Sequence, residues 1–335
     1  MENKRNDYLD LLKFFLIVLI IITHSNLALS HREGNFLFPF IIDMSVPCFL
    51  VISGYVNSIS FSKTSNQNSW FYERKSLVRK TCRIIIPFVP LTFIVIFCWV
   101  FLDRISLLNL LFNIVFQRWG QGGYYPIIML QFIVLFPLLA RITEKPLGCV
   151  ALLLLNLLSE ICFSFLSEMT YGSIFTCFHR ICILRYLSFI VAGILLYRNR
   201  QSVSLKSTML TGLFGLVLVY CVNYITVFDH IFKLWQTTSL PVVLWACFPV
   251  MTMLLLERKQ ENNNNLIFKC CTSLGKASYH IFLIQMIWYF LSAKEGLFQE
   301  PPLLFSIAAC LLIGFLFYQM DLLVQKTIIG KLNHV

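Results

Sequence analysis

Long runs of apolar residues repeat along the chain, and short polar segments separate them. A helix needs about 20 mostly apolar residues to cross a bilayer, whereas a transmembrane β-strand alternates apolar with polar positions. The runs therefore predict an all-α, polytopic membrane protein of about ten transmembrane helices, forming a single domain over residues 1–335. The predicted spans are 9–29, 36–59, 84–102, 124–140, 147–166, 181–197, 209–228, 239–256, 278–291 and 302–323. A further apolar run, 107–116, is too short to cross and is expected to lie at the membrane interface.

Composition agrees with this class. The 335 residues are 58% hydrophobic and 13% charged, and soluble domains carry about 25% charged residues. A water-soluble enzyme, a disordered chain and a disulfide-stapled secreted module are thereby excluded. The 12 cysteines include no CxxC pair and no His/Cys metal spacing. We therefore expect them to pack between helices and expect no metal site.

The net charge of +11 has a topological explanation. If the N-terminus is cytosolic, the cytosolic segments hold roughly three times as many Lys and Arg residues as the opposite side. This bias supports ten spans and places both termini in the cytosol. It accounts for the basic balance without a nucleic-acid partner.

The first predicted span carries three ionisable residues, Asp10, Lys13 and His24. Charges inside a span are costly, so they are functional candidates by default. Asp10 and Lys13 are one helical turn apart and are expected to pair. A snorkelling ion pair at the interface explains these two equally well. For His24 the alternative is a packed, hydrogen-bonded helix histidine.

The second predicted span brings further polar residues. Asp43 should lie at about the height of His24 on an adjacent antiparallel helix. An Asp beside a His fixes its tautomer and stabilises its protonated form, so the sequence predicts a His24–Asp43 pair. Ser53-Gly54 lies toward the cytosolic end, where glycine permits close approach of a helix or a ligand.

A basic segment follows on the cytosolic side. Arg79 and Arg83 are one helical turn apart and present both guanidinium groups on one face. Such a pair suits a pyrophosphate or a 3′-phosphate. The alternative, an anchor on anionic lipid, is favoured for Lys75 and Lys80.

These residues, in this order, resemble acyltransferase family 3, membrane proteins that O-acetylate cell-surface glycans. The matching segments run over most of the chain, and ten spans is the usual architecture of the family. They are Tyr8-Leu-Asp10-Leu-Leu-Lys13 with His24, Val46-Pro47-Cys-Phe49-Leu-Val-Ile-Ser53-Gly54-Tyr55, Arg79-x-x-x-Arg83-x-x-x-Pro87, Tyr124-Tyr125, Arg185-Tyr-Leu-x-Phe189-x-x-x-Gly193, and Leu274-Gly275-x-x-Ser278-Tyr279-x-Ile281-Phe-Leu-x-Gln285.

The resemblance implies acetyl-CoA as a cytosolic donor, a catalytic histidine matching His24 and an arginine cluster matching Arg79 and Arg83. It also implies a multi-pass protein of a bacterial cell membrane. Two positions depart from the family. Lys13 stands where many members have Arg, which removes a bidentate donor. Gln285 stands where many have His, so a second titrating histidine is not assumed there.

The sequence thus predicts an O-acetyltransferase that moves an acetyl group from acetyl-CoA to a hydroxyl of a surface or lipid-linked glycan. His24 and Asp43 are the catalytic candidates, and Asp10, Lys13, Ser53, Gly54, Arg79 and Arg83 are the donor-binding candidates. Tyr124, Tyr125 and Arg180 are candidates for acceptor binding, against an aromatic belt and an interfacial anchor as alternatives.

Two other functions are open. A transporter would use the charges of the first span as a proton relay, but it would be expected to show broken helices and an internal repeat. Neither is visible in the sequence. Acyl transfer to a non-sugar acceptor is the second alternative. The acceptor hydroxyl, the acyl length and the oligomeric state are not determined by the sequence.

Overall fold

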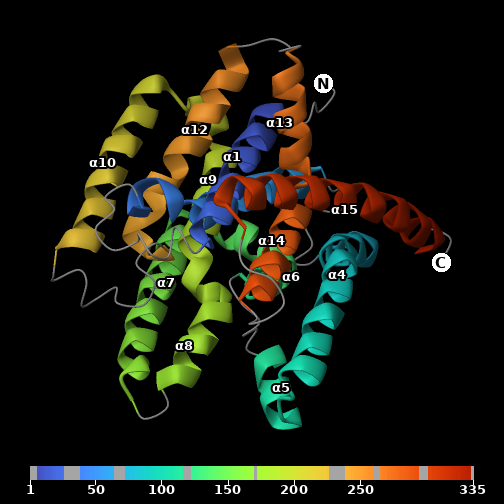
Figure 1. The fold of residues 1–335 in the computed structure, drawn as a ribbon. Helices are drawn as coiled ribbons and strands as arrows, with labels where there is room; N and C mark the ends of the chain where they lie inside the picture. Colours follow the sequence, from blue (N-terminus) through green and yellow to red (C-terminus); the bar gives the residue numbers. More distant parts are fainter. Residues whose placement is uncertain are drawn as a thin grey trace. The chain divides into compact units, whose positions relative to one another are not determined.

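The computed structural model describes residues 6–25, 38–63, 72–115, 122–169, 172–225, 238–259, 265–293 and 301–332, and within them every regular element is helical. The all-α class predicted from the sequence is confirmed. The α-helices are α1 (Asp7–Thr23), α3 (Ser45–Ser62), α4 (Arg74–Phe97), α5 (Leu107–Val115), α6 (Tyr125–Ile142), α7 (Pro146–Ser167), α8 (Gly172–Ile181), α9 (Leu187–Arg198), α10 (Leu205–Tyr224), α12 (Val243–Lys259), α13 (Leu266–Lys276), α14 (Ser278–Ser292) and α15 (Leu303–Leu332) (Figure 1). Short π-helical segments are η1 (Phe38–Ile42) and η2 (Cys98–Leu102), and 3-10 segments are η3 (Ile183–Tyr186), η4 (Arg200–Ser202) and η6 (Leu240–Val242).

Among the described residues, 7 helices are long and apolar enough to cross a membrane, and a bent helix pair makes up to 8. The chain is therefore a multi-pass membrane protein by helix length and composition. Helices α1 and α14 coincide with the first and ninth predicted spans but have only 17 and 15 residues. They measure about 25 and 22 Å at 1.5 Å per residue, less than a bilayer core. The predicted count of ten spans is not confirmed.

The structure contains a bent helix pair that is not visible in the sequence. Ile174–Ile181 and Ile183–Arg198 meet at 54°, and the predicted span 181–197 begins at this bend. Cys182 adopts an extended backbone with ψ 127, and the chain then continues as the 3-10 segment η3. Neither proline nor glycine marks this bend.

The described chain divides into two compact units. Unit 1 comprises Met1–Ile20, Arg32–Trp70 and Phe136–Lys276. In it α3 packs along α9, and α10 lies beside α12 (Figure 1). The α3–α9 contact is backbone to backbone, because a Cβ on Gly193 would lie 2.2 Å from the carbonyl oxygen of Val51. Small residues at such crossings let membrane helices approach closely.

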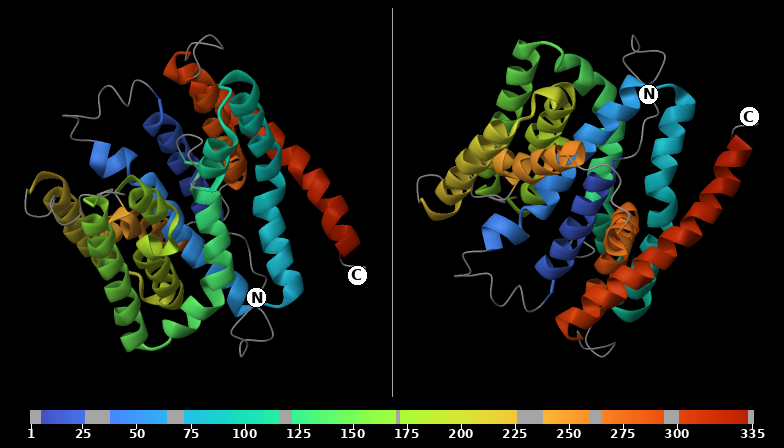
Figure 2. Two further views of the ribbon diagram at one scale, coloured as in Figure 1. Left: turned by 90° about the horizontal axis from the view of Figure 1, so that it is seen from below. Right: turned by 90° about the horizontal axis from the view of Figure 1, so that it is seen from above.

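Unit 2 comprises Ile21–His31, Phe71–Leu135 and Ala277–Val335. Its centre is α14, which contacts both α15 and α4 (Figure 2). A Cβ on Gly314 of α15 would lie 2.5 Å from the Cα of Ile281, so these two helices also meet closely. Rings of Trp99 and Phe290 pack edge to face, with centroids 6.1 Å apart.

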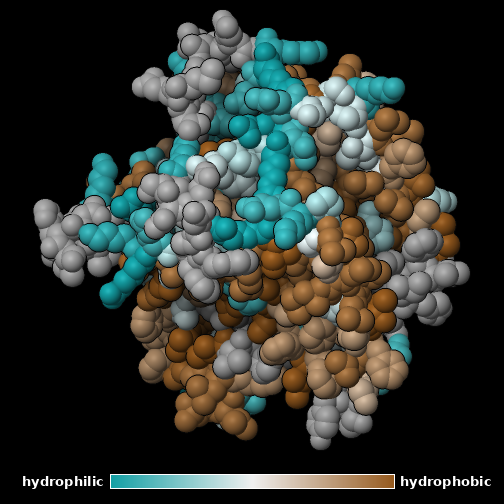
Figure 3. All heavy atoms as spheres, turned by 180° about the vertical axis from the view of Figure 1, so that it is seen from behind, coloured by the Kyte–Doolittle hydropathy of each residue, from teal (hydrophilic) through white to brown (hydrophobic). Residues whose placement is uncertain are grey.

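Large apolar side chains cover much of the molecular surface. Figure 3 shows a broad hydrophobic area on the face it draws. On α10, Met209, Leu213 and Phe214 are each exposed by about 60%, and on α15 Leu304 is 80% exposed. Soluble monomers rarely expose such continuous apolar area, whereas lipid chains would cover it.

Candidate functional site

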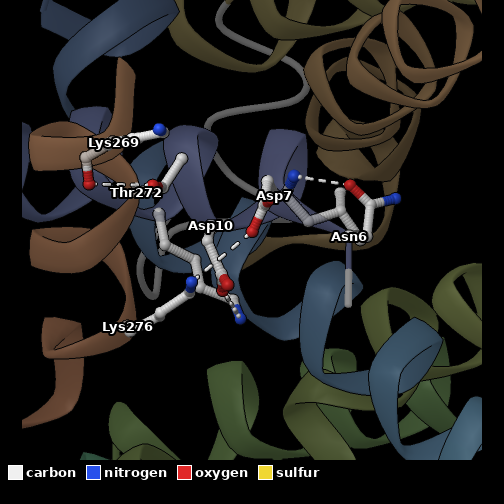
Figure 4. Close-up of polar contacts among 8 residues, drawn as sticks. Asn6, Asp7, Asp10, Lys269, Thr272 and Lys276 are labelled. Carbon is white, nitrogen blue, oxygen red and sulfur yellow. Dashed lines mark hydrogen bonds and ion pairs between the residues drawn. The ribbon is translucent and has the colours of Figure 1, made fainter. Parts of the chain in front are cut away.

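The first polar cluster lies in unit 1 at the start of α1. The Asp10 carboxylate is buried and lies 3.0 Å from the Lys13 ammonium, so the predicted ion pair is present. Asp7 pairs with Lys276 of α13 at 3.5 Å (Figure 4). Each of these lysines therefore already has a carboxylate partner. A role of Asp10 and Lys13 in holding a donor stays a prediction.

Helix α13 docks on α1 through a glycine. A Cβ on Gly275 would lie only 1.7 Å from the carbonyl oxygen of Asp10, so no other residue fits without moving one helix. The rings of Tyr8 and Phe268 extend the contact, with centroids 5.3 Å apart. This contact joins the first and the last of the sequence segments that resemble acyltransferase family 3.

Asn6 ties the start of α1 to a third helix. Its side-chain oxygen accepts a hydrogen bond from the backbone N–H of Leu9 at 2.9 Å, as a helix N-cap does. Its side-chain amide donates to Glu257 of α12. The N-terminal turn of α1 is thus fixed against α12 and α13.

The predicted arginine pair lies on α4 in unit 2. Arg79 and Arg83 are both exposed. Between them, Lys80 donates to the Tyr72 hydroxyl at 3.2 Å and stands over the Tyr72 ring. Burial raises the pKa of Tyr72, so its hydroxyl stays protonated at neutral pH. Lys80 is thereby directed to an aromatic partner, while the two guanidinium groups reach solvent.

His24 occupies a turn that follows α1 directly, not the helix itself, and its side chain is half-buried. The neighbouring Ser25 is buried, and its hydroxyl donates to the carbonyl of Ile22 at 2.8 Å. The buried hydroxyl of Tyr289, on α14, donates to the carbonyl of Ile21 at 2.9 Å. These two bonds fix the turn that carries His24.

Asp43 is half-buried in the turn between η1 and α3, and its backbone N–H donates to Phe38 at 3.0 Å. His24 belongs to unit 2 and Asp43 to unit 1. Their pairing stays a prediction.

Ser53 and Gly54 lie on α3. A Cβ on Gly54 would lie 2.5 Å from the carbonyl oxygen of Ile190 on α9, so helix packing accounts for this glycine. Ser53 is half-buried, and its carbonyl accepts a bond from Asn57 at 3.0 Å. Contact of either residue with a ligand stays a prediction.

The three acceptor candidates fall in both units. Tyr124 is buried, and the Tyr125 ring packs on Phe282 at 5.2 Å, both within unit 2. Arg180 is half-buried near the end of α8 in unit 1, and its carbonyl accepts the hydroxyl proton of Tyr186 at 2.9 Å. Their contact with an acceptor stays a prediction.

One buried pair was missed by the sequence analysis. In unit 2, His280 Nε2 of α14 lies 2.8 Å from an Asp321 carboxylate oxygen of α15. Gln325 Nε2 donates to the same oxygen at 2.5 Å. Both residues lie inside predicted spans, where an ionisable side chain is a warning signal by itself. The prediction used the ionisable residues of the first span and not those of the ninth and tenth.

We expect Asp321→Ala to destabilise the protein by about 3 kcal/mol, because it leaves the buried Nε2 atoms of His280 and Gln325 without their acceptor. Thermal unfolding of the detergent-solubilised protein measures this. Gln319→Ala, at an exposed position of the same helix, should change stability by less than about 0.5 kcal/mol. Equal stability of the two variants would contradict a structural role for the pair.

Comparison with known proteins identifies the family of the chain. The family model described as an acyltransferase domain, that of acyltransferase family 3, matches residues 6–319, from α1 into α15. No curated protein and no solved structure gave a match. The matched region includes the α1–α13 contact, the arginines of α4 and the turn that carries His24. The chain belongs to acyltransferase family 3.

Proposed function

We propose that this membrane acyltransferase moves an acetyl group from cytosolic acetyl-CoA to a hydroxyl of a surface or lipid-linked glycan. The proposal rests on the family match over residues 6–319 together with the membrane helices. The measurement that tests it is transfer of labelled acetyl from acetyl-CoA to envelope glycan as an alkali-labile ester.

One observation supports a route from the donor site to His24. On α14, the Tyr279 hydroxyl donates to the carbonyl of Ile84, next to Arg83, at 3.1 Å. Ten residues later the Tyr289 hydroxyl bonds Ile21, next to the His24 turn. Ten residues of helix span about 15 Å. Within unit 2, α14 therefore holds the basic segment and the His24 turn at a separation that a flexible pantetheine arm can bridge.

In this proposal Arg79 and Arg83 hold the donor phosphates, and Lys13 and Asp10 are further donor-binding candidates. The pantetheine arm passes Ser53 and Gly54. Guanidinium groups bind phosphates through paired, charge-assisted hydrogen bonds.

His24 acts as the general base. It takes the proton of the sugar hydroxyl, the oxygen bonds the acetyl carbonyl carbon, and the carbon–sulfur bond breaks to release CoA as the thiolate. The proton then passes from the imidazolium to the thiolate or to solvent, which restores the base. An imidazole can take up and release a proton near neutral pH, which suits this step. Asp43 would orient the imidazole, and Tyr124, Tyr125 and Arg180 would contact the acceptor.

We expect Arg79→Ala to raise the KM for acetyl-CoA at least about tenfold and to lower kcat much less, because it removes ground-state binding of the phosphates. Steady-state kinetics with varied acetyl-CoA measures both. Lys75→Ala, one turn earlier on the same helix and also exposed, should leave the KM within about twofold. An unchanged KM for acetyl-CoA in Arg79→Ala would show that the donor phosphates do not bind on α4.

The broken span at α8–α9 favours one second candidate, a transporter, because discontinuous helices often form transport sites. A transporter would leave the thioester intact. Release of free CoA therefore separates the two functions.

A further inference from the structure

Buried polar side chains gather in unit 1 around the bend between α8 and α9. On α7, Asn156 and Glu160 are one turn apart and buried, although the apolar side chains of Leu154 and Leu158 on the same helix are 59% and 58% exposed. Apolar packing would be the less costly choice here, because polar groups are expensive to bury in a membrane protein. The bend cluster consists of Asn156, Glu160, His179, Arg185, Ser188 and Thr238, all buried.

Part of the bend cluster stabilises the bend itself. The Asn156 side-chain amide donates to the carbonyls of Leu184 and Arg185, both at 2.9 Å. These carbonyls lie in η3, where the helical bonding pattern changes. Glu160 accepts the backbone N–H of Leu240 at 3.1 Å, and Arg185 Nε donates to the Thr238 hydroxyl at 2.9 Å. Backbone groups freed by a broken helix must be satisfied in this way.

Other atoms of the bend cluster are not used by the fold. Both ring nitrogens of His179, the hydroxyl of Ser188 and the side-chain oxygen of Asn156 have no hydrogen-bond partner among the described residues. His179 is 1% exposed and Ser188 is 0% exposed. Buried polar atoms of native proteins are nearly always paired with protein, water or ligand. Together these atoms offer both donors and acceptors.

The groups of the bend cluster indicate which ligand fits. Glu160 and His179 both lie close enough to Arg185 to interact with it electrostatically. The Phe163 ring, 4.8 Å from the His179 ring, adds an apolar wall. Mixed donors and acceptors beside an aromatic ring suit the hydroxyl groups of a neutral sugar.

The predicted topology puts the bend cluster on the acceptor side. Helix α7 begins at Pro146, beside the basic residues assigned to the cytosol. Glu160 lies 14 residues further, about 21 Å along the axis and thus in the outer half of a 30 Å bilayer core. We propose that the bend cluster binds the hydroxyl groups of the acceptor sugar, with His179, Ser188 and Asn156 as its contacts. This inference rests on the proposed glycan acceptor.

His179→Phe and Ser188→Ala test the proposal. Each removes unpaired buried polar atoms and keeps most of the shape, so each should leave thermal stability unchanged or raise it. Each should also raise the apparent KM for acceptor at least tenfold while the KM for acetyl-CoA stays within twofold. The probe is envelope glycan extracted from the producing cells, de-O-acetylated with mild alkali and varied in concentration with the purified protein in nanodiscs.

The control is Thr252→Val on α12, whose hydroxyl bonds its own helix at Phe248, and it should change neither KM. An unchanged acceptor KM in both test variants would overturn the inference and assign the unpaired atoms to buried water. An equal rise in the KM for acetyl-CoA and in the KM for acceptor would overturn it too, because it would indicate general disruption of the protein. If the wild-type protein transfers no acetyl group to this glycan, the proposed function fails instead.

Discussion

His24→Ala is expected to lower the rate of acetyl transfer by about 10²–10⁴, the usual contribution of a positioned general base. The loss should appear in kcat, with the KM for acetyl-CoA nearly unchanged, because the imidazole acts on the acceptor hydroxyl and not on the donor phosphates. Stability should change little, since the side chain is half-buried in a turn whose backbone is held by Ser25 and Tyr289. Initial rates with labelled acetyl-CoA measure the effect.

Two variants separate base catalysis from disruption of the turn. His24→Gln keeps a polar side chain of similar reach without a base, so it should be as inactive as His24→Ala. Ser25→Ala removes the neighbouring hydroxyl that bonds Ile22 and should retain activity within a few-fold. Activity surviving in His24→Gln would assign the base to another residue.

Gly275→Val is expected to destabilise the protein by at least about 3 kcal/mol, at the upper end of overpacking costs. The new Cβ would lie 1.7 Å from the Asp10 carbonyl oxygen and 2.6 Å from its carbon. Both are backbone atoms of α1, which cannot rotate away as a side chain does. Helix α13 must therefore separate from α1, and the Asp7–Lys276 pair should be lost with it.

Thermal unfolding and the yield of monodisperse protein measure this effect. Gly212→Ala on α10 is the matched control, because the three atoms nearest to its Cβ all belong to the Phe248 ring, the first at 2.7 Å. That ring can shift, and alanine also favours the helix, so the net cost should stay below about 1 kcal/mol. Similar destabilisation by both variants would mean that the α1–α13 contact is not specially tight.

The hydropathy pattern predicted the helices well where each one is continuous. The predicted span 147–166 lies within α7, and the span 302–323 begins one residue before α15, because 20 apolar residues have few alternatives in a bilayer. It did not predict α8, which meets the following helical segment at 54°. Neither proline nor glycine marks the bend between them, and the carbonyl of Arg185 is satisfied by Asn156, 29 residues away.

Only contacts between residues close in the sequence could be predicted for the candidate site. Asp10 and Lys13 pair within one helical turn, and the sequence anticipates it. The His280–Asp321 pair joins residues 41 apart, and Glu160 meets Leu240 across 80 positions. Such contacts depend on how helices pack, which periodicity in one sequence does not specify. Periodicity gives the inward face of a helix but not its partner.

Gly275 shows what the structure adds to a sequence resemblance. In the sequence motif Gly275 is simply a matching residue. In the fold it is the point at which α13 contacts the backbone of Asp10. The motif therefore has a packing reason at this position, independent of any ligand. Gly54 has one as well, against Ile190.

The most direct test is acetyl transfer across a sealed membrane. Proteoliposomes with the cytosolic face outward would receive acetyl-labelled acetyl-CoA outside and hold de-O-acetylated envelope glycan inside. The account predicts alkali-labile label on the enclosed glycan with one free CoA left outside per ester formed, and at most about a hundredth of that initial rate in His24→Ala vesicles. Intact acetyl-CoA or free acetate accumulating inside, with no labelled glycan, would contradict it.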